Sequence, residues 1–213
     1  MCFSAAASLT AGSMLSITGL LSLSYTKTIA QRMIAAIPLF FGIQQLAEGM
    51  VWKGMEQGNE LWVTSGSYLF LFFAFFVWPV WVPLSMHFMT KNIFRKKIII
   101  GTLFIGLTVG IYLMHNITTS GLMVTISNAH IVYEINIDQF KLIGSIAYLI
   151  ATIVPFFVIQ LAPVNIMGTT IALSYVITYL YYTQALISVW CFFAALISLG
   201  CIFITHYLKR KNI

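Results

Sequence analysis

Apolar residues gather into seven segments along this chain, separated by shorter polar connections. Each segment is close to the roughly 20 residues that an α-helix needs to cross a lipid bilayer. The segments cover residues 4–25, 33–53, 62–89, 97–115, 140–162, 167–183 and 185–207. The pattern predicts an all-α integral membrane protein in which seven transmembrane helices form a bundle. Only Thr183 and Gln184 separate the last two segments, so one long kinked helix there, with six spans in all, is the alternative.

The connection at residues 116–139 has a different pattern. Apolar residues such as Val124, Ile126 and Tyr133 alternate with polar ones on both sides of a turn around Asn128. A period of two with a central turn is typical of a β-hairpin. We expect this hairpin to lie over one mouth of the bundle, either as a lid or as a simple connection.

The composition excludes a soluble protein. Hydrophobic residues make up 60% of the chain and charged residues only 8%, against about 25% charged residues in ordinary soluble domains. The mean hydropathy is +0.95, and a soluble core of this length could not hide so much apolar surface. Residues 1–213 are therefore predicted to form a single transmembrane domain in contact with the lipid bilayer. The composition leaves the oligomeric state open.

Basic residues are distributed unequally between the two sides that seven alternating spans would define. One side receives nine of the 11 basic residues, namely Lys27, Arg32, Lys91, Arg95, Lys96, Lys97, Lys209, Arg210 and Lys211. The positive-inside rule places that side in the cytoplasm, with the N-terminus outside and the C-terminus inside. This distribution accounts for the net charge of +6 without a nucleic-acid partner, because no basic stripe lies along a polar helix.

Small residues and prolines predict local features of the bundle. Gly106 and Gly110 form a GxxxG motif, which lets two membrane helices approach closely. Pro79 and Pro83 lie four residues apart in the third segment, where they should distort the helix. We interpret this distortion as a kink that shapes the bundle, with a gating hinge as the alternative.

Glu48 is the one acidic residue that falls inside an apolar segment. A carboxylate in the hydrocarbon region costs several kcal/mol unless it finds a partner or a wet cavity, so such a residue indicates a functional site. Gln44, Glu48 and Trp52 follow one another at intervals of four and share a helix face. The predicted topology places Glu48 about one turn below the outer surface.

Several residue types that bind metals are predicted on the same outer side. They are Cys2, Glu48, His115, His130 and Cys191. Carboxylate, imidazole and thiolate groups are the ligands of transition metals such as zinc. No HExxH or CxxC spacing supports the site, so a metal is a hypothesis beside the simpler interpretation of interfacial histidines and packed cysteines.

Two classes of seven-span proteins can be tested directly. A retinal protein needs a lysine in its last span, and residues 185–207 contain none. The membrane metal hydrolases that include the alkaline ceramidases have an HxxxH pair in the last span, whereas this segment has only His206. Both classes are therefore disfavoured.

Three strings carry a closer resemblance to a known family: MCFSAAAS at the start, IPLFFGIQQLAEGMVW in the second segment and SVWCFFAALISL in the last. Together with WPVWVP and HIVYE, they resemble a family of small bacterial multi-pass membrane proteins that begin MCFSA and have no known function. The resemblance implies a bacterial inner (plasma) membrane and supplies no catalytic role. It places in the family pattern Cys2, Glu48, Trp52, His130, Tyr133, Ser188, Trp190 and Cys191.

The leading interpretation is an outward-facing polar pocket under the hairpin that binds a small ligand or a metal ion in a sensor or receptor. Its expected lining is Gln44, Glu48, Trp52, Tyr133, Tyr182, Ser188 and Trp190. One alternative is a membrane-embedded hydrolase or transferase with metal-activated water or Glu48 as general base. Another is a proton-coupled carrier, although the inner halves of the spans have few polar residues. The sequence does not decide whether the protein is an enzyme.

Overall fold

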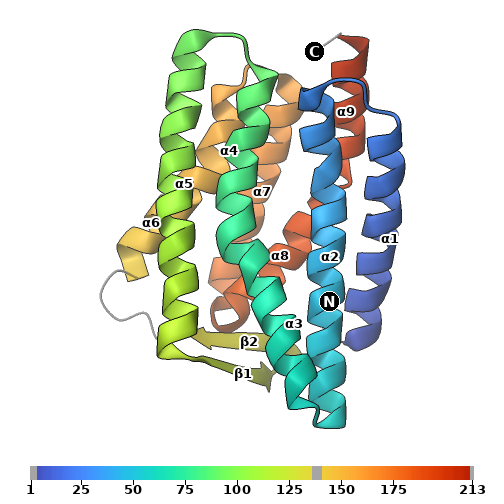
Figure 1. The fold of residues 1–213 in the computed structure, drawn as a ribbon, viewed down its shortest axis with the longest axis vertical. Helices are drawn as coiled ribbons and strands as arrows, with labels where there is room; N and C mark the ends of the chain where they lie inside the picture. Colours follow the sequence, from blue (N-terminus) through green and yellow to red (C-terminus); the bar gives the residue numbers. More distant parts are fainter. Residues whose placement is uncertain (1–3, 136–140, 212–213) are drawn as a thin grey trace.

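The computed structural model describes residues 4–135 and 141–211, which form a helical bundle with one β-hairpin at its end (Figure 1). The helices are α1 (Ala5–Ser24), α2 (Ile29–Gln57), α3 (Glu60–Phe72), α4 (Trp78–Met89), α5 (Ile93–Ser120), α6 (Lys141–Val158), α7 (Ala162–Tyr181), α8 (Leu186–Ile197) and α9 (Gly200–Arg210). A π-helical turn, η1 (Phe73–Val77), joins α3 to α4, and a 3₁₀ turn, η2 (Thr183–Ala185), precedes α8. The strands are β1 (Leu122–Ser127) and β2 (His130–Ile135).

The all-helical architecture agrees with the pattern of apolar segments. Six helical stretches among the described residues are long and apolar enough to cross a membrane, which indicates a membrane protein. The predicted segment 140–162 corresponds to α6, whose apolar part, Leu142–Val158, is shorter than the others. The boundary at Thr183 is a real break, because α7 ends at Tyr181 and the 3₁₀ turn η2 follows.

Helix α5, which corresponds to the predicted segment 97–115, is longer than predicted at both ends. It begins at Ile93 because Asn92 caps it: the Asn92 side chain accepts hydrogen bonds from two backbone amides of the first turn. It continues to Ser120, five residues beyond the predicted end at residue 115. Side chains in this extension, including Asn116 and Thr119, donate to carbonyls one turn back in the same helix. The predicted hairpin region 116–139 is therefore wrong at its start, since the hairpin itself occupies 122–135.

The hairpin pairs its two strands antiparallel in a regular register from Leu122–Ile135 to Ser127–His130. Its two turn residues, Asn128 and Ala129, both have positive φ, as a two-residue turn between twisted strands requires. Strand β2 is the inner strand: four consecutive residues, His130–Tyr133, are buried. The hairpin lies across the end of the bundle at which α5 ends, and α8 lies above it (Figure 1).

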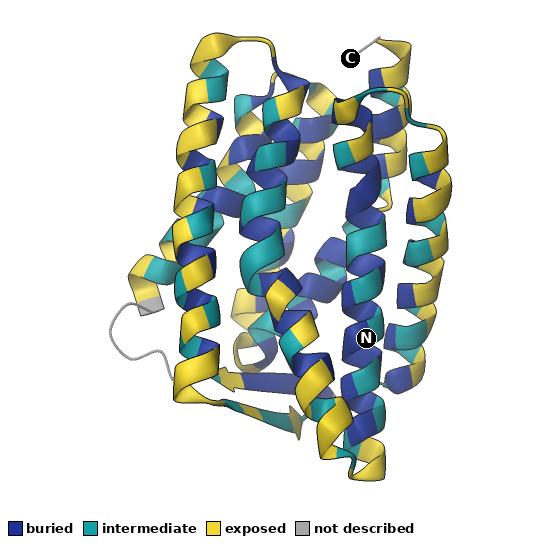
Figure 2. Cartoon of the chain, in the orientation of Figure 1, coloured by how far each residue is buried: buried dark blue, intermediate teal, exposed yellow. Residues whose placement is uncertain are grey.

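Helix α2 is the central helix of the bundle. Figure 2 shows it dark blue along most of its length, whereas α1 and α5 are exposed on one side. Seventeen of its 29 residues are buried. A polar residue in α2 is therefore surrounded by protein, and each must find its partner there.

The kink expected from Pro79 and Pro83 takes the form of η1, the π-helical turn that directly precedes Trp78 and Pro79. Proline has no N–H to donate to the carbonyl four residues earlier, so the regular helical hydrogen bonding is interrupted there. The GxxxG motif packs against this distorted stretch. A Cβ atom added to Gly106 would lie 1.8 Å from the Pro79 carbonyl oxygen, and one added to Gly110 would lie 3.0 Å from that of Phe75.

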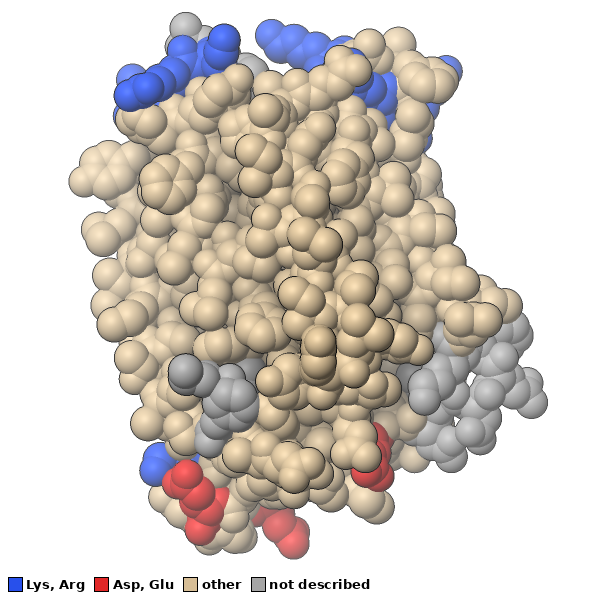
Figure 3. All heavy atoms as spheres, turned by 180° about the vertical axis from the view of Figure 1, so that it is seen from behind, with Lys and Arg blue, Asp and Glu red and all other residues tan. Residues whose placement is uncertain are grey.

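Charged side chains separate to the two ends of the molecule. Figure 3 shows Lys and Arg gathered at one end, and Asp and Glu at the other with one basic residue beside them. At the acidic end, Lys53 forms an ion pair with Glu56 at 2.9 Å. The surface between the two ends is free of described charged side chains in this view, as expected where lipid would contact the protein.

Candidate functional site

The buried polar residues of α2 form a cluster at the centre of the bundle. Gln44, Gln45 and Glu48 each have 0% of their surface exposed, and Trp52 has 6%. The interval of four residues puts Gln44, Glu48 and Trp52 on one face, as the sequence predicts. Leu, Ile or Ala would be the ordinary occupants of such positions, so these residues require specific partners.

Glu48 finds one partner in α8. The Ser188 hydroxyl donates a hydrogen bond of 2.5 Å to Glu48 Oε1, and Ser188 is itself fully buried. The two residues are 140 positions apart in the chain. Two members of the predicted pocket therefore meet, and they join the central helix to α8.

Gln44 connects four helices. Its amide Nε2 lies 3.3 Å from the carbonyl oxygen of Phe70 in α3 and 3.4 Å from the sulfur of Cys191 in α8. Its amide oxygen accepts a 2.8 Å hydrogen bond from the indole N–H of Trp78 in α4. Since both ends of a buried amide are satisfied, Gln44 fixes the positions of these helices relative to α2.

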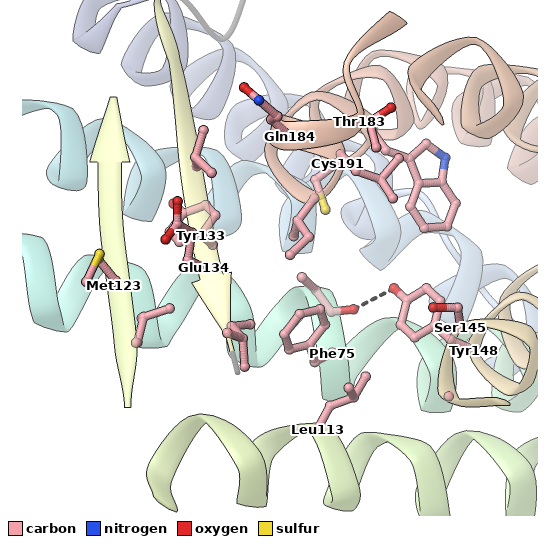
Figure 4. A pocket seen from close by; sticks show the side chains of 18 of the residues that line it. Phe75, Leu113, Met123, Tyr133, Glu134, Ser145, Tyr148, Thr183, Gln184 and Cys191 are labelled. Atoms are coloured by element: carbon pink, nitrogen blue, oxygen red, sulfur yellow. Dashed lines mark hydrogen bonds between the residues drawn. The ribbon is translucent and has the colours of Figure 1, made fainter. Parts of the chain in front are cut away.

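The π-helical turn η1 is hydrogen-bonded to helix α6. The hydroxyl of Tyr148 in α6 donates a 2.5 Å hydrogen bond to the carbonyl oxygen of Ala74 (Figure 4). π-Helical turns displace backbone carbonyls from their regular partners and are frequent at functional sites. This turn therefore joins α6 to the α3–α4 helix beside a cavity whose wall includes both Ala74 and Tyr148.

That cavity has a volume of about 1140 Å³ and lies directly beneath the hairpin. Its wall comes from α5, α6, α7, α8, the η1 and η2 turns and both strands. Figure 4 shows Tyr133, Glu134 and Met123 of the hairpin on one side and Tyr148 and Ser145 of α6 on the other, with Cys191 between them. Six aromatic residues contribute to the wall: Phe75, Tyr112, Tyr133, Tyr148, Tyr175 and Trp190.

Three of these aromatic residues form a continuous wall where α6, α7 and α8 meet. The Trp190 ring lies 5.0 Å from the Tyr175 ring and 5.9 Å from the Tyr148 ring, both edge to face. Such pairs stabilise each other by about 0.5–1.5 kcal/mol beyond their buried area. We call Tyr148, Tyr175 and Trp190 the aromatic wall.

The cavity and the Glu48 cluster meet at one residue of α8, Cys191. Cys191 lines the cavity and also accepts the hydrogen bond from Gln44. The described residues that line the cavity do not include Glu48, Gln44 or Ser188. Glu48 therefore lies behind the wall of the cavity, whereas the sequence had led us to expect it as part of the lining.

The remaining predicted pocket residues are divided between the cavity and its surroundings. Tyr133 and Trp190 line the cavity. Trp52 packs in the core that supports the hairpin, in the same apolar cluster as Tyr133. Tyr182 lies against His130, with ring centroids 5.1 Å apart.

The hairpin is fixed to the bundle by its buried side chains. Tyr133 stacks on Phe70 of α3, with ring centroids 5.1 Å apart and planes 14° apart. His130 is 7% exposed, and its burial lowers the pKa of the imidazole below the ordinary value of 6.5. The neutral form is therefore favoured in the docked hairpin.

The structure does not support a metal site. No group of three or more His, Cys, Asp or Glu side chains in the described part of the chain could hold a metal ion. His115 is exposed on α5, and the Cys191 sulfur is engaged with Gln44. Cys2, the remaining predicted ligand, lies outside the described residues. The described residues therefore do not support the predicted zinc-type centre.

Several cavity residues were not foreseen, above all Phe75, Tyr112 and Tyr148. They are aromatic residues within apolar segments, which most often pack in a core. The signal that could have found Tyr148 is its hydroxyl, because a buried Tyr O–H needs an acceptor. Nothing in the sequence indicates that the acceptor is the carbonyl of Ala74.

The comparisons with known proteins identify a family and no activity. The chain belongs to a family of unknown function, DUF6629, whose family model matches residues 1–212. This confirms the resemblance to a family without an established activity. No curated protein and no solved structure matches the chain.

Proposed function

We propose that this protein is a membrane receptor or sensor whose cavity beneath the hairpin binds a small organic molecule. The observation that carries the proposal is the cavity of about 1140 Å³, slightly above the roughly 300–1,000 Å³ of typical small-molecule sites. Its wall is mainly apolar and aromatic with a few polar groups, as in such sites. One of them is the indole N–H of Trp190, a buried donor without a hydrogen-bond partner among the described residues.

The distribution of charge supports an outward-facing cavity. The basic residues of the described segments apart from Lys53 and Lys141 belong to the end of the molecule opposite the hairpin. The positive-inside rule would place that end in the cytoplasm and the hairpin outside. With α6 counted as a membrane helix, the chain crosses seven times, starts outside and ends in the cytoplasm. We propose the plasma membrane of a bacterium as its location.

Cys191 supports a signalling role, because it lines the cavity and also bonds to Gln44 of the Glu48 cluster. A ligand that displaces the Cys191 side chain would disturb Gln44, which holds α2, α3, α4 and α8 together. Helix α4 ends at Met89, at the basic end of the molecule. The geometry thus offers a physical connection from the cavity to the opposite end of the bundle.

The test uses a variant that fills the cavity. Gly144 lines the cavity, and a Cβ atom added to it meets no other atom within 4 Å. A side chain can therefore begin at this position without a clash, and Gly144→Trp is designed to place an indole in the cavity. Wild type and variant are extracted with their surrounding lipid in polymer-bounded discs, and small molecules released from each are identified by mass spectrometry. We expect at least one species enriched over the bulk membrane in the wild type and reduced to the bulk level in the variant.

Gly101→Trp is the matched control. Gly101 is an exposed position on α5, and a Cβ atom there also meets nothing within 4 Å, but it does not line the cavity. This variant should retain the bound species. Identical small-molecule content in the wild type and in Gly144→Trp would contradict the proposed function.

A further inference from the structure

We infer that the ligand of the cavity is an organic cation with an apolar body, held between Glu134 and the aromatic wall. The inference rests on the proposed function, since it assumes that the cavity holds a ligand. It goes further in assigning the ligand a charge and a shape. Three features carry it: the charge at the mouth, the aromatic residues around the space and the apolar depth behind them.

The charge around the cavity is negative. Glu134 is the one charged side chain among the described lining residues, and it is exposed. The charged residues of the described segments at this end of the molecule are Lys53, Glu56, Glu60, Glu134 and Lys141, the first residue of α6. Two positive and three negative charges leave a net charge of −1, and Lys53 is already paired with Glu56. Such a field raises the local concentration of cations and repels anions.

The aromatic residues provide the second feature. A cation over the face of Trp or Tyr, within about 6 Å of the ring centre, gains about 0.5–2 kcal/mol, and Trp is the best of these rings. Trp190 is held between Tyr148 and Tyr175 by edge-to-face contacts. An anionic or strongly polar neutral ligand would gain nothing comparable from such a wall.

The third feature is the apolar depth of the site. A second, smaller cavity of about 40 Å³ lies deeper in the bundle and shares Tyr148, Trp190 and Cys191 with the first. Its other lining residues include Phe156, Met167 and Ile171. The two spaces are therefore adjacent at these three shared side chains. A ligand with an alkyl or aryl group can therefore extend inward while its charged group stays near Glu134.

The test compares three probes with the same alkyl chain and different head groups: hexyltrimethylammonium, hexanol and hexanesulfonate. Each is titrated into the full-length protein in lipid nanodiscs. Binding is followed by the part of the tryptophan fluorescence change that Trp190→Phe removes, since this aromatic replacement keeps the wall and loses the signal. We expect the ammonium compound to bind more tightly than the alcohol, and the sulfonate to bind least.

Variants locate the binding of the ammonium compound. Glu134→Gln should weaken it about threefold, because the carboxylate is exposed and exposed charge pairs contribute little, and should leave hexanol binding unchanged. Tyr175→Leu should weaken the ammonium compound about twofold to thirtyfold. Glu60→Gln removes an acidic side chain at the same end that does not line the cavity, so it should weaken binding less than Glu134→Gln does. Gly144→Trp should abolish binding of all three probes.

Equal affinity for hexanol and hexyltrimethylammonium, both lost in Gly144→Trp, would overturn the cationic ligand and leave the proposed function intact. An ammonium signal that persists in Gly144→Trp would show partition into lipid and would also overturn the inference. Failure of the proposed function has a different signature: no small molecule is enriched by the wild type relative to Gly144→Trp.

Discussion

At the scale of single residues, the hydrogen bond between Glu48 and Ser188 should contribute strongly to the free energy of unfolding. A buried acceptor that loses its donor costs about 1–3 kcal/mol, and more when it is charged. Glu48 Oε1 receives the Ser188 hydroxyl in a fully buried environment. The pair also joins two helices that are far apart in the sequence. It is therefore a contact on which the assembly of the bundle depends.

We predict that Ser188→Ala lowers the stability of the folded protein by about 1–3 kcal/mol, because Glu48 Oε1 then loses that donor. The measurement is thermal unfolding of the purified protein in detergent. Ser198→Ala is the control: Ser198 is equally buried in the same part of the chain, but its hydroxyl bonds to the Ala195 carbonyl within its own turn. Equal losses of stability in the two variants would show that the hydrogen bond between helices contributes no more than the hydrogen bond within one turn.

The sequence predicts that Glu48 needs a buried partner, because it is a carboxylate within an apolar segment. The identity of the partner could not be predicted from the sequence. Ser188 is an ordinary small polar residue, and 140 positions separate it from Glu48. The aromatic wall was unpredictable for the same reason: Tyr148, Tyr175 and Trp190 come from three helices. Periodicity assigns a residue to a face of its own helix, but it does not identify the helix that packs against that face.

At the scale of elements, the close contact between α5 and the distorted α3–α4 helix depends on one glycine. We predict that Gly106→Ala destabilises the protein by about 1–3 kcal/mol or more, since the new methyl group would overlap the Pro79 carbonyl oxygen and force the helices apart. Thermal unfolding in detergent measures the loss.

Gly101→Ala serves as the control for this helix. It makes the same chemical change five residues earlier, at a position where a Cβ atom meets no neighbour within 4 Å. It should be neutral or slightly stabilising, because alanine favours the helix over glycine by about 1 kcal/mol. A destabilisation as large as that of Gly106→Ala would refute the steric explanation.

The hairpin element should respond to pH through His130. Burial lowers the pKa of this imidazole in the folded protein, so protonation favours the unfolded or undocked chain. The contribution of neutral His130 is fully present above about pH 6.5 and is lost as the pH falls through the lowered value. We predict a decline in melting temperature from about pH 8 to about pH 5 that is smaller in His130→Phe.

Phenylalanine is chosen because it can retain the edge contact with Tyr182, the aromatic neighbour of His130, while it does not titrate. The exposed His115 serves as the control, since His115→Phe should leave the pH profile of the wild type unchanged. If His130→Phe and the wild type lose stability in parallel as the pH falls, another group must be responsible.

The elements themselves were the most predictable part of the structure, because each apolar segment is helical, although the third and the last are each divided into two helices. The errors lie where side chains extend or interrupt a helix. Asn92 and the hydroxyls after His115 lengthen α5, and Pro79 turns the expected kink into a π-helical turn. These effects depend on single hydrogen bonds that a hydropathy pattern does not record.

At the scale of the whole molecule, the separation of basic and acidic ends leads to a test of topology. The three native cysteines are replaced by alanine, and one new cysteine is added at each end. Gln57→Cys lies at the acidic end, at the last residue of α2, and Lys91→Cys lies at the basic end before α5; both positions are exposed. A membrane-impermeant maleimide on intact cells should label Gln57→Cys alone.

After the cells are permeabilised, both variants should react, which controls for the accessibility of Lys91→Cys. Labelling of Lys91→Cys in intact cells, with Gln57→Cys protected, would reverse the proposed orientation. It would also turn the cavity toward the cytoplasm, and the ligand would then have to come from inside the cell.

Cys191 has one more consequence, for chemical biology. Its thiol is buried but lies on the wall of a cavity large enough for a small molecule, so a binder that carries a disulfide or a mild electrophile would be captured by a covalent bond only after it has entered the cavity. Cys201, the other cysteine in the described part of the chain, is buried in α9 and does not line this cavity. Reversible tethering libraries could therefore be screened against the native sequence, with Cys191→Ser as the reference. A family without a known ligand would then have a direct experimental way to find one.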